Sequence, residues 1–236
     1  MTIFRTYILV IIAIMVSISI IAQESNSIDS SFLKEVYNTY NDAQTYDMDV
    51  EVAMYNEDNN LSYPKQINQT IKSGNSFYIQ THEITTVHAS DFQLVVDNNS
   101  KQIRYLKYDL KQKEELKDQN TKLSVPDFTE MEDEIESIQS YESKTVVVFK
   151  ENPQYKKTVY TFNTGSKLLE QVDYYAEGSE YGQPAHIQIV YTTKNFNEST
   201  DSTVFELENY IVSDGNELKP SNTFKTYSLI NNTINP

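Results

Sequence analysis

Hydrophobic and polar positions along this chain change their period several times, and the first period is helical. The apolar residues after position 30 recur at intervals of three and four: Phe32, Leu33, Val36, Tyr37 and Tyr40. Asp29 and Ser30 precede this run and can cap a helix start, because their side-chain oxygens accept hydrogen bonds from free backbone N–H groups. The pattern predicts a helix over residues 29–43.

The period then changes to two. Tyr46, Met48, Val50, Val52 and Met54 alternate with mostly acidic positions, which predicts a β-strand with one buried face. Similar short segments follow, separated by turns rich in Asn, Gly and Ser. They are residues 66–73, 76–89, 91–97, 102–110, 144–150, 155–163, 167–177 and 185–193. Consecutive short strands of this kind indicate an antiparallel sheet.

One further segment has a helical period. In residues 126–140, Phe128, Met131, Ile135 and Ile138 are spaced at helical intervals, and Pro126 stands in front of them. We therefore expect a second helix. The fold class is α+β: a curved antiparallel sheet with an N-terminal helix and this second helix covering its concave face. Only five glycines favour a gently curved sheet over a small closed barrel.

The first residues differ from the rest. Arg5 is followed by an apolar run over residues 7–22 and then by polar residues, which predicts a secretory signal peptide cleaved after Ala22. An uncleaved anchor is the alternative, although the run is short for a membrane span. The predicted divisions are a signal peptide at 1–22, one domain at 23–212 and a C-terminal extension at 213–236. We expect a periplasmic protein, with secretion as the alternative.

Composition excludes some classes of function. The chain contains no cysteine, so it has no disulfide and no thiolate for catalysis or metal binding. Its formal net charge of −15 repels phosphate backbones, which argues against nucleic acid binding.

Known catalytic patterns do not fit. The stretch THEITTVH places His82 and His88 six residues apart in a strand pattern, whereas a zinc protease needs two histidines four apart on a helix. His186 has no visible partner. Ser166 lacks the second glycine of a nucleophile elbow, and the acids within 130–136 suit a solvated helix face. We therefore expect no catalytic residue, no metal and no cofactor, and we expect that the protein is not an enzyme.

Aromatic residues are unusually frequent, with 18 tyrosines and 10 phenylalanines. Most suit strand packing, but a curved sheet with only two helices leaves part of its inner face free for an apolar ligand. The candidate ligand-binding residues, which could equally be ordinary core, are Met48, Val50, Val52, Phe77, Ile79, Phe92, Leu94, Ile187 and Ile189 on strands and Phe128, Met131 and Ile135 on the second helix.

The order of these features resembles the LolA-like periplasmic lipoprotein carriers over roughly residues 28–212. The matching segments include SFLKEVYNTYNDAQTYDMDVEV, SGNSFYIQ, DFQLVVDNNSKQIRYLKYD and the closing stretch with Asn195, Asn197 and Phe205. The resemblance implies an incomplete antiparallel barrel with helices over its open face and an apolar cavity for lipoprotein acyl chains. Such carriers typically have an arginine in an early strand, where this chain has only Lys65 and Lys72.

Two hypotheses follow. The first is a soluble carrier or binding protein that sequesters lipoproteins or other acylated ligands, with acyl chains of lipoproteins or another lipid as its partner. The second is a non-catalytic envelope scaffold of the same fold that interacts with envelope proteins. We expect a monomer in either case.

Overall fold

The computed structural model describes residues 31–109, 128–176, 184–215 and 217–233. The predicted signal peptide and its cleavage site lie outside these ranges. Within them, no helix is both long enough and apolar enough to span a lipid bilayer.

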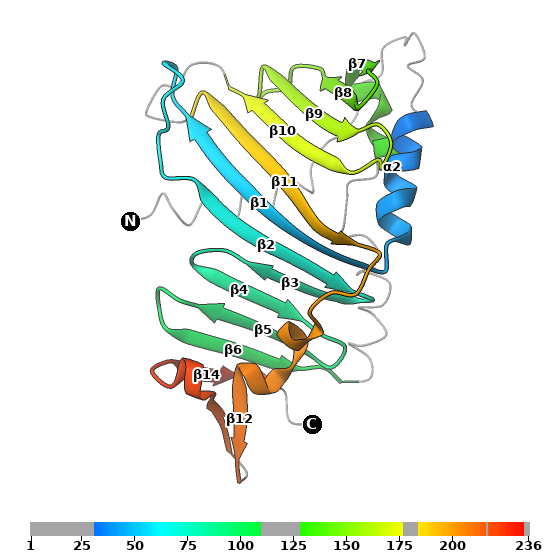
Figure 1. Ribbon diagram of the computed structural model, residues 1–236. Coiled ribbons are helices and arrows are strands. Elements are labelled where there is room, and N and C mark those ends of the chain that lie inside the picture. Colours follow the sequence, from blue (N-terminus) through cyan, green and yellow to red (C-terminus); the bar gives the residue numbers. More distant parts are fainter. Residues whose placement is uncertain (1–30, 110–127, 177–183, 216, 234–236) are drawn as a thin grey trace.

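The described residues form one long curved sheet with a single α-helix beside it (Figure 1). The sheet has 12 strands in the order β14-β6-β5-β4-β3-β2-β1-β11-β10-β9-β8-β7, and it does not close on itself. All neighbouring strands are antiparallel except β14 and β6. The elements are α2 (Ser31–Asp42), β1 (Thr45–Tyr55), β2 (Gln66–Ser73), β3 (Ser76–Gln80), β4 (Ile84–His88), β5 (Phe92–Asp97), β6 (Gln102–Lys107), η2 (Phe128–Glu134), β7 (Ile135–Ser140), β8 (Lys144–Phe149), β9 (Lys157–Asn163), β10 (Leu169–Tyr175), β11 (His186–Phe196), η3 (Ser202–Phe205), η4 (Leu207–Asn209), β12 (Ile211–Asp214), β13 (Glu217–Pro220), η5 (Asn222–Phe224) and β14 (Ser228–Asn231). The curved sheet and the N-terminal helix were both predicted.

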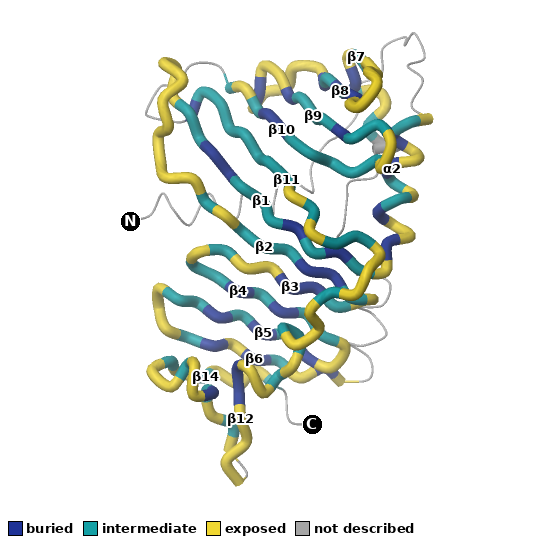
Figure 2. The backbone as a smooth tube through the Cα atoms, in the orientation of Figure 1, coloured by how far each residue is buried: buried dark blue, intermediate teal, exposed yellow. Residues whose placement is uncertain are grey.

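Two hydrophobic cores lie on opposite faces of this sheet. The first joins Leu33, Val36 and Tyr40 of α2 to side chains of β1, β3, β8 and β9, and we name this side of the sheet the α2 face. The second joins alternate side chains of β2–β6 to the chain after β11, and we name this side the C-terminal face. Figure 2 shows the buried positions recurring along these strands. Each half of the sheet is thus packed mainly from a different side.

The β3 strand takes part in both cores. Phe77 belongs to the core on the α2 face, whereas the next residue, Tyr78, belongs to the core on the C-terminal face. Because successive side chains of a strand point to opposite faces, both can be buried only where each face is covered. The two exposed fractions are 6% and 7%.

The residues from Ser213 onward, predicted as a C-terminal extension, contribute regular structure. Strands β12 and β13 form a small hairpin, and β14 adds to the sheet parallel to β6 (Figure 1). The Tyr210 hydroxyl donates to the Val204 carbonyl at 2.9 Å, and the Ser221 hydroxyl donates to the Asn209 carbonyl at 2.8 Å. These bonds satisfy polar groups around the second core.

The predicted second α-helix is wrong. Residues 128–134 form the 3-10 helix η2, and residues 135–140 form β7, which pairs with β8. A β-bulge between Ile135 and Ser137 adds one residue, so Ile135 and Ile138 reach the same face of the sheet although they are three positions apart. This spacing is the one that a helix would show.

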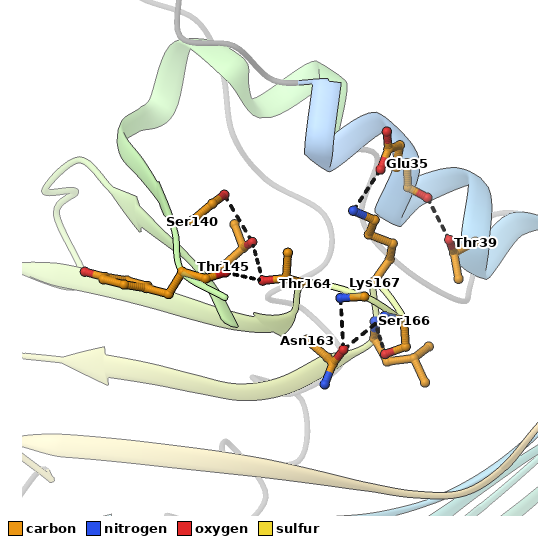
Figure 3. A network of polar contacts seen from close by, with 11 residues as sticks. Glu35, Thr39, Ser140, Thr145, Asn163, Thr164, Ser166 and Lys167 are labelled. Atoms are coloured by element: carbon orange, nitrogen blue, oxygen red, sulfur yellow. Dashed lines mark hydrogen bonds and ion pairs between the residues drawn. The ribbon is translucent and has the colours of Figure 1, made fainter. Parts of the chain in front are cut away.

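The α2 helix is fastened to the turn between β9 and β10 (Figure 3). The Lys167 ammonium lies 2.9 Å from the Glu35 carboxylate and 4.5 Å from the centre of the Phe32 ring. The backbone N–H of Leu169 donates to the Tyr40 hydroxyl at 2.9 Å. At the far end of the helix, the ammonium of buried Lys72 donates to the Ala43 carbonyl at 2.7 Å. The helix is therefore held at both ends.

The buried Tyr40 predicts a loss of stability at alkaline pH. Burial raises the pKa of its hydroxyl to about 12, against about 10 in an unfolded chain. The native state thus holds this proton more tightly, and the resulting stabilisation, about 2 to 3 kcal/mol, is complete below pH 10 and is lost as the pH rises through 12. The test is denaturant unfolding of wild type and Tyr40→Phe between pH 8 and 12. We expect Tyr40→Phe to have the lower free energy of unfolding at pH 8, and we expect the gap between the two free energies to shrink above pH 10. A gap that stays constant with pH would contradict this.

Candidate ligand-binding face

The α2 face continues beyond the part that α2 covers. Cross-strand pairs in β1 and β11 fix this surface: Val50 pairs with Tyr191, Val52 with Ile189, and Met54 with Ile187. Paired residues on neighbouring strands point to the same side, so these side chains share the α2 face. On β10 and β9 the same side is continued by Val172, Tyr174, Tyr160 and Thr158.

This surface is uncharged. On β1 and β7–β11, the residues that the register assigns to the α2 face include no Asp, Glu, Lys, Arg or His. The other side of the same strands is charged, with ion pairs between Lys194 and Asp49 at 2.6 Å and between Lys65 and Glu51 at 2.6 Å. The acidic positions that alternate along β1 thus all lie away from the apolar side.

The α2 core covers only one end of the apolar surface. Tyr46 and Met48 belong to that core, whereas Val50, Ile187 and Ile189 belong to neither core and remain partly exposed. We name the part beyond the core the apolar platform, defined as Val50, Val52, Met54, Val172, Tyr174, Ile187, Ile189 and Tyr191. Val52 and Val172 are buried, at 5% and 2% exposed, and the other six side chains are partly exposed. Partly exposed apolar groups that lie side by side are typical of a surface that another apolar group covers.

Tyrosine hydroxyls supply some of the polar atoms beside this platform. The hydroxyls of Tyr160 and Tyr174 lie 3.3 Å apart, and the rings of Tyr155 and Tyr174 lie 4.8 Å apart between centres. Burial raises the pKa of all three hydroxyls above the usual value of tyrosine. They therefore stay protonated at neutral pH, where they provide hydrogen-bond donors without a charge.

The structure brings most of the predicted ligand-binding residues to one side. Those on the α2 face are Met48, Val50, Val52, Phe77, Ile79, Ile187 and Ile189. Phe92 and Leu94 lie on the C-terminal face, buried in the second core, and cannot share a site with the others. Ile135 is buried in the α2 core and Met131 packs against it. The side chain of Phe128 lies outside the described residues.

The histidines do not form a metal site. His82 is exposed at a turn, and His88 lies within hydrogen-bond distance of the Tyr108 hydroxyl, at 3.1 Å. No group of three metal-binding side chains occurs in the part of the chain that the structure describes.

His186, which has no visible partner along the chain, has one in the folded structure. His186 Nε2 lies 2.8 Å from the buried Asp173 carboxylate, and its ring stacks between Tyr55 and Tyr175 at 5.3 and 4.4 Å between centres. This cluster lies on the charged side of β10 and β11, away from the apolar platform. Its residues are adjacent only through the sheet register, so spacing along the chain could not reveal it.

Comparison with known proteins finds similar solved structures but no protein of similar sequence. No family model and no curated protein matches the chain. A crystal structure of an uncharacterised conserved protein from Thermus thermophilus matches with a TM-score of 0.43 and 7% identity, over 84% of this chain and 98% of that one. A LolA superfamily protein from Nitrosomonas europaea matches with a TM-score of 0.32 and 10% identity, over 76% and 97%.

A third solved structure is described as a putative outer membrane lipoprotein-sorting protein domain, from Vibrio parahaemolyticus. It matches with a TM-score of 0.32 and 8% identity, over 75% of this chain and 94% of that one. The structural neighbours therefore include LolA superfamily and lipoprotein-sorting proteins, the class that the sequence resembles. At these TM-scores the similarities assign no function to this chain.

Proposed function

We propose that this protein is a periplasmic, monomeric binding or carrier protein for acylated hydrophobic ligands, lipoproteins among them. The observation that supports this is the apolar platform, an uncharged continuation of the α2 face on which six of the eight side chains remain partly exposed, all but Val52 and Val172. Sequestration there would remove an acyl chain from water without any covalent step.

The energetic argument concerns the length of the acyl chain. Each methylene group removed from water contributes about 0.8 kcal/mol, so even a partly covered chain of a dozen carbons binds appreciably. The alternation in β1 meanwhile keeps Asp47, Asp49 and Glu51 on the other side of the sheet, opposite the apolar groups. A sheet with one apolar and one charged side suits a carrier that must stay dissolved while it holds a lipid.

The experiment has two parts. Protein purified from its native compartment without detergent is extracted with organic solvent, and the extract is examined by mass spectrometry for acylated molecules. Delipidated protein is then titrated with the uncharged dye N-phenyl-1-naphthylamine, whose fluorescence rises in apolar surroundings. We expect bound acyl compounds in the extract and saturable dye binding. A clean extract together with no dye uptake would refute the proposal.

A second candidate function is a scaffold that binds another envelope protein. It is favoured by exposed apolar residues in the connection between β1 and β2 and at the start of β2: Leu61 is 49%, Tyr63 45% and Ile67 66% exposed. These residues are distinct from the apolar platform. Protein without lipid or dye binding that still recovers a specific envelope partner, with recovery lost on Ile67→Ser, would support this function instead.

A further inference from the structure

The start of β2 leaves one side of a strand without a neighbour. β2 begins at Gln66, but β3 pairs with it only from Gln69, which lies opposite Gln80 at the end of β3. The Thr81 N–H already donates to the Ile84 carbonyl of β4 at 2.8 Å, so the chain turns away from β2 at this point. On the side of β3, the first residues of β2 therefore form an open strand edge.

Ile67 presents the free backbone groups of this edge. In an antiparallel strand the N–H and C=O of one residue point to the same neighbour, and successive residues alternate between the two neighbours. The Gly74 N–H donates to the Gln44 carbonyl at 2.8 Å, and the register between β2 and β1 is continuous, so even-numbered residues of β2 bond β1. The N–H and C=O of Ile67 thus point to the empty side, and among the described residues no hydrogen bond reaches them from there.

The side chain of Ile67 does not protect the edge. Open edges in native proteins usually carry a charge, a proline or a bulge that prevents pairing with another chain. Pro64 and Lys65 precede β2 and limit the length of the edge, but Ile67 itself is apolar and β-branched. It is 66% exposed, the highest value for a large apolar side chain within the described ranges. A short extended segment with an apolar residue opposite Ile67 fits this position.

Charge around the edge restricts the partner further. The connection that precedes β2 carries Glu57 and Asp58, and the turn after β3 carries Glu83. None of these three forms an ion pair in the part of the chain that the structure describes, whereas Lys65 is already paired with Glu51 at 2.6 Å. The whole chain has a formal net charge of −15. A segment with lysine or arginine beside its apolar residue is therefore attracted, and an acidic segment is repelled.

We propose that the open edge at Ile67 binds an extended, basic peptide segment of another protein, which adds to β2 as a short antiparallel strand in the place that β3 leaves free. The N–H and C=O of Ile67 bond the peptide backbone, and an apolar side chain of the peptide packs beside that of Ile67. This inference does not rest on the carrier function. It specifies the way in which the second candidate function, the binding of an envelope protein, operates.

The test compares three fluorescein-labelled peptides by fluorescence anisotropy at low ionic strength. The first is acetyl-Lys-Thr-Val-Thr-Lys-amide, the second has glutamate in place of both lysines, and the third is the first with an N-methyl group on valine. We expect saturable binding of the first peptide and at least fivefold weaker binding of the second, because its charges are repelled. The third should bind about fivefold more weakly than the first, because it lacks the N–H that bonds the Ile67 carbonyl.

Two variants assign the contact to the edge of β2. Ile67→Ser should weaken the binding of the basic peptide about fivefold, because it removes the apolar cross-strand pair. Ile230→Ser is the matched control, since Ile230 is also an exposed isoleucine, at 38%, on the edge strand β14. Its peptide affinity should equal that of wild type. The thermal midpoints of both variants should stay close to wild type, because both side chains are exposed.

Hydrogen exchange followed by NMR locates the bound peptide. The N–H of Ile67 should exchange with solvent at least fivefold more slowly at saturating peptide, because it gains a hydrogen bond. The N–H of Asn68, which points to β1, should exchange at the same rate with and without the peptide. Slower exchange elsewhere in the sheet with no change at Ile67 would place the peptide at another site and contradict the proposal.

The remaining outcomes separate this inference from the carrier function. Absence of peptide binding, equal affinity for the basic and the acidic peptide, or equal affinity of wild type and Ile67→Ser would overturn the inference. Self-association without peptide that is lost in Ile67→Ser would also overturn it, because a second copy of the chain would then occupy the edge. Lipid and dye binding are measured independently of these peptides, so their failure would reject the carrier function and leave this inference standing.

Discussion

Replacing Phe162 by alanine is expected to lower the free energy of unfolding by about 3 to 5 kcal/mol, a large share of the stability of a domain. Phe162 is 0% exposed and belongs to the core under α2. Its ring meets Phe32 edge to face at 5.7 Å and Tyr160 at 6.2 Å. Alanine would leave a cavity that helix and sheet, fastened by Lys167 and Tyr40, cannot close. Urea unfolding followed by circular dichroism measures the effect.

Tyr141→Ala is the matched control for this substitution. Tyr141 is also aromatic and lies at the turn between β7 and β8 of the same half of the sheet, but it is 58% exposed. We expect a change within about 0.5 kcal/mol, because removing an exposed ring costs little transfer energy. Similar losses for both variants would show that Phe162 does not occupy the packed position described.

Ile189→Lys is expected to abolish binding of uncharged dye and lipid. Ile189 lies near the middle of the apolar platform, opposite Val52 and Val172. A lysine there places a charge on a surface that has none, and any apolar ligand covering it would have to desolvate the ammonium at a cost of several kcal/mol. We predict at least a hundredfold loss of dye affinity in fluorescence titrations.

Val190→Lys is the control one position along the same strand. Val190 lies on the charged side, where it pairs with Glu51 across β1. The same new charge should be tolerated there, since a cross-strand pair of opposite charges is mildly favourable. Dye affinity should therefore match wild type. Equal losses in the two variants would place the dye elsewhere than on the apolar platform.

Local periodicity predicted most strands and the N-terminal helix because the side chains concerned follow a single period. The alternation in β1 is uninterrupted from Tyr46 to Met54, since its two neighbours, β11 and β2, pair with most of the length of β1. The second helix was wrong because a bulge at the start of β7 gave Ile135 and Ile138 a three-residue spacing on one face. A periodic pattern cannot distinguish a bulged strand from a helix of the same length.

The candidate site was only partly predictable for a different reason. Apolar alternation shows that a strand has a buried face, but not which side of the sheet that face takes. Phe92 and Leu94 alternate as well as Val50 and Val52 do, yet they are buried against the chain after β11 rather than on the α2 face. Asn68 carried no signal at all, because only the sheet register places it beside Val50 on the α2 face.

The placement of Phe77 and Tyr78 in separate cores has a consequence for cooperativity. With one core on each face, we expect the molecule to have two partly independent folding units that share β3. A destabilising substitution in the core under α2 would first unfold the strands on the β7 side. The amide protons of β4–β6 would remain slow to exchange with solvent. The half of the sheet under α2 can therefore loosen while the half that the C-terminal segment covers stays folded.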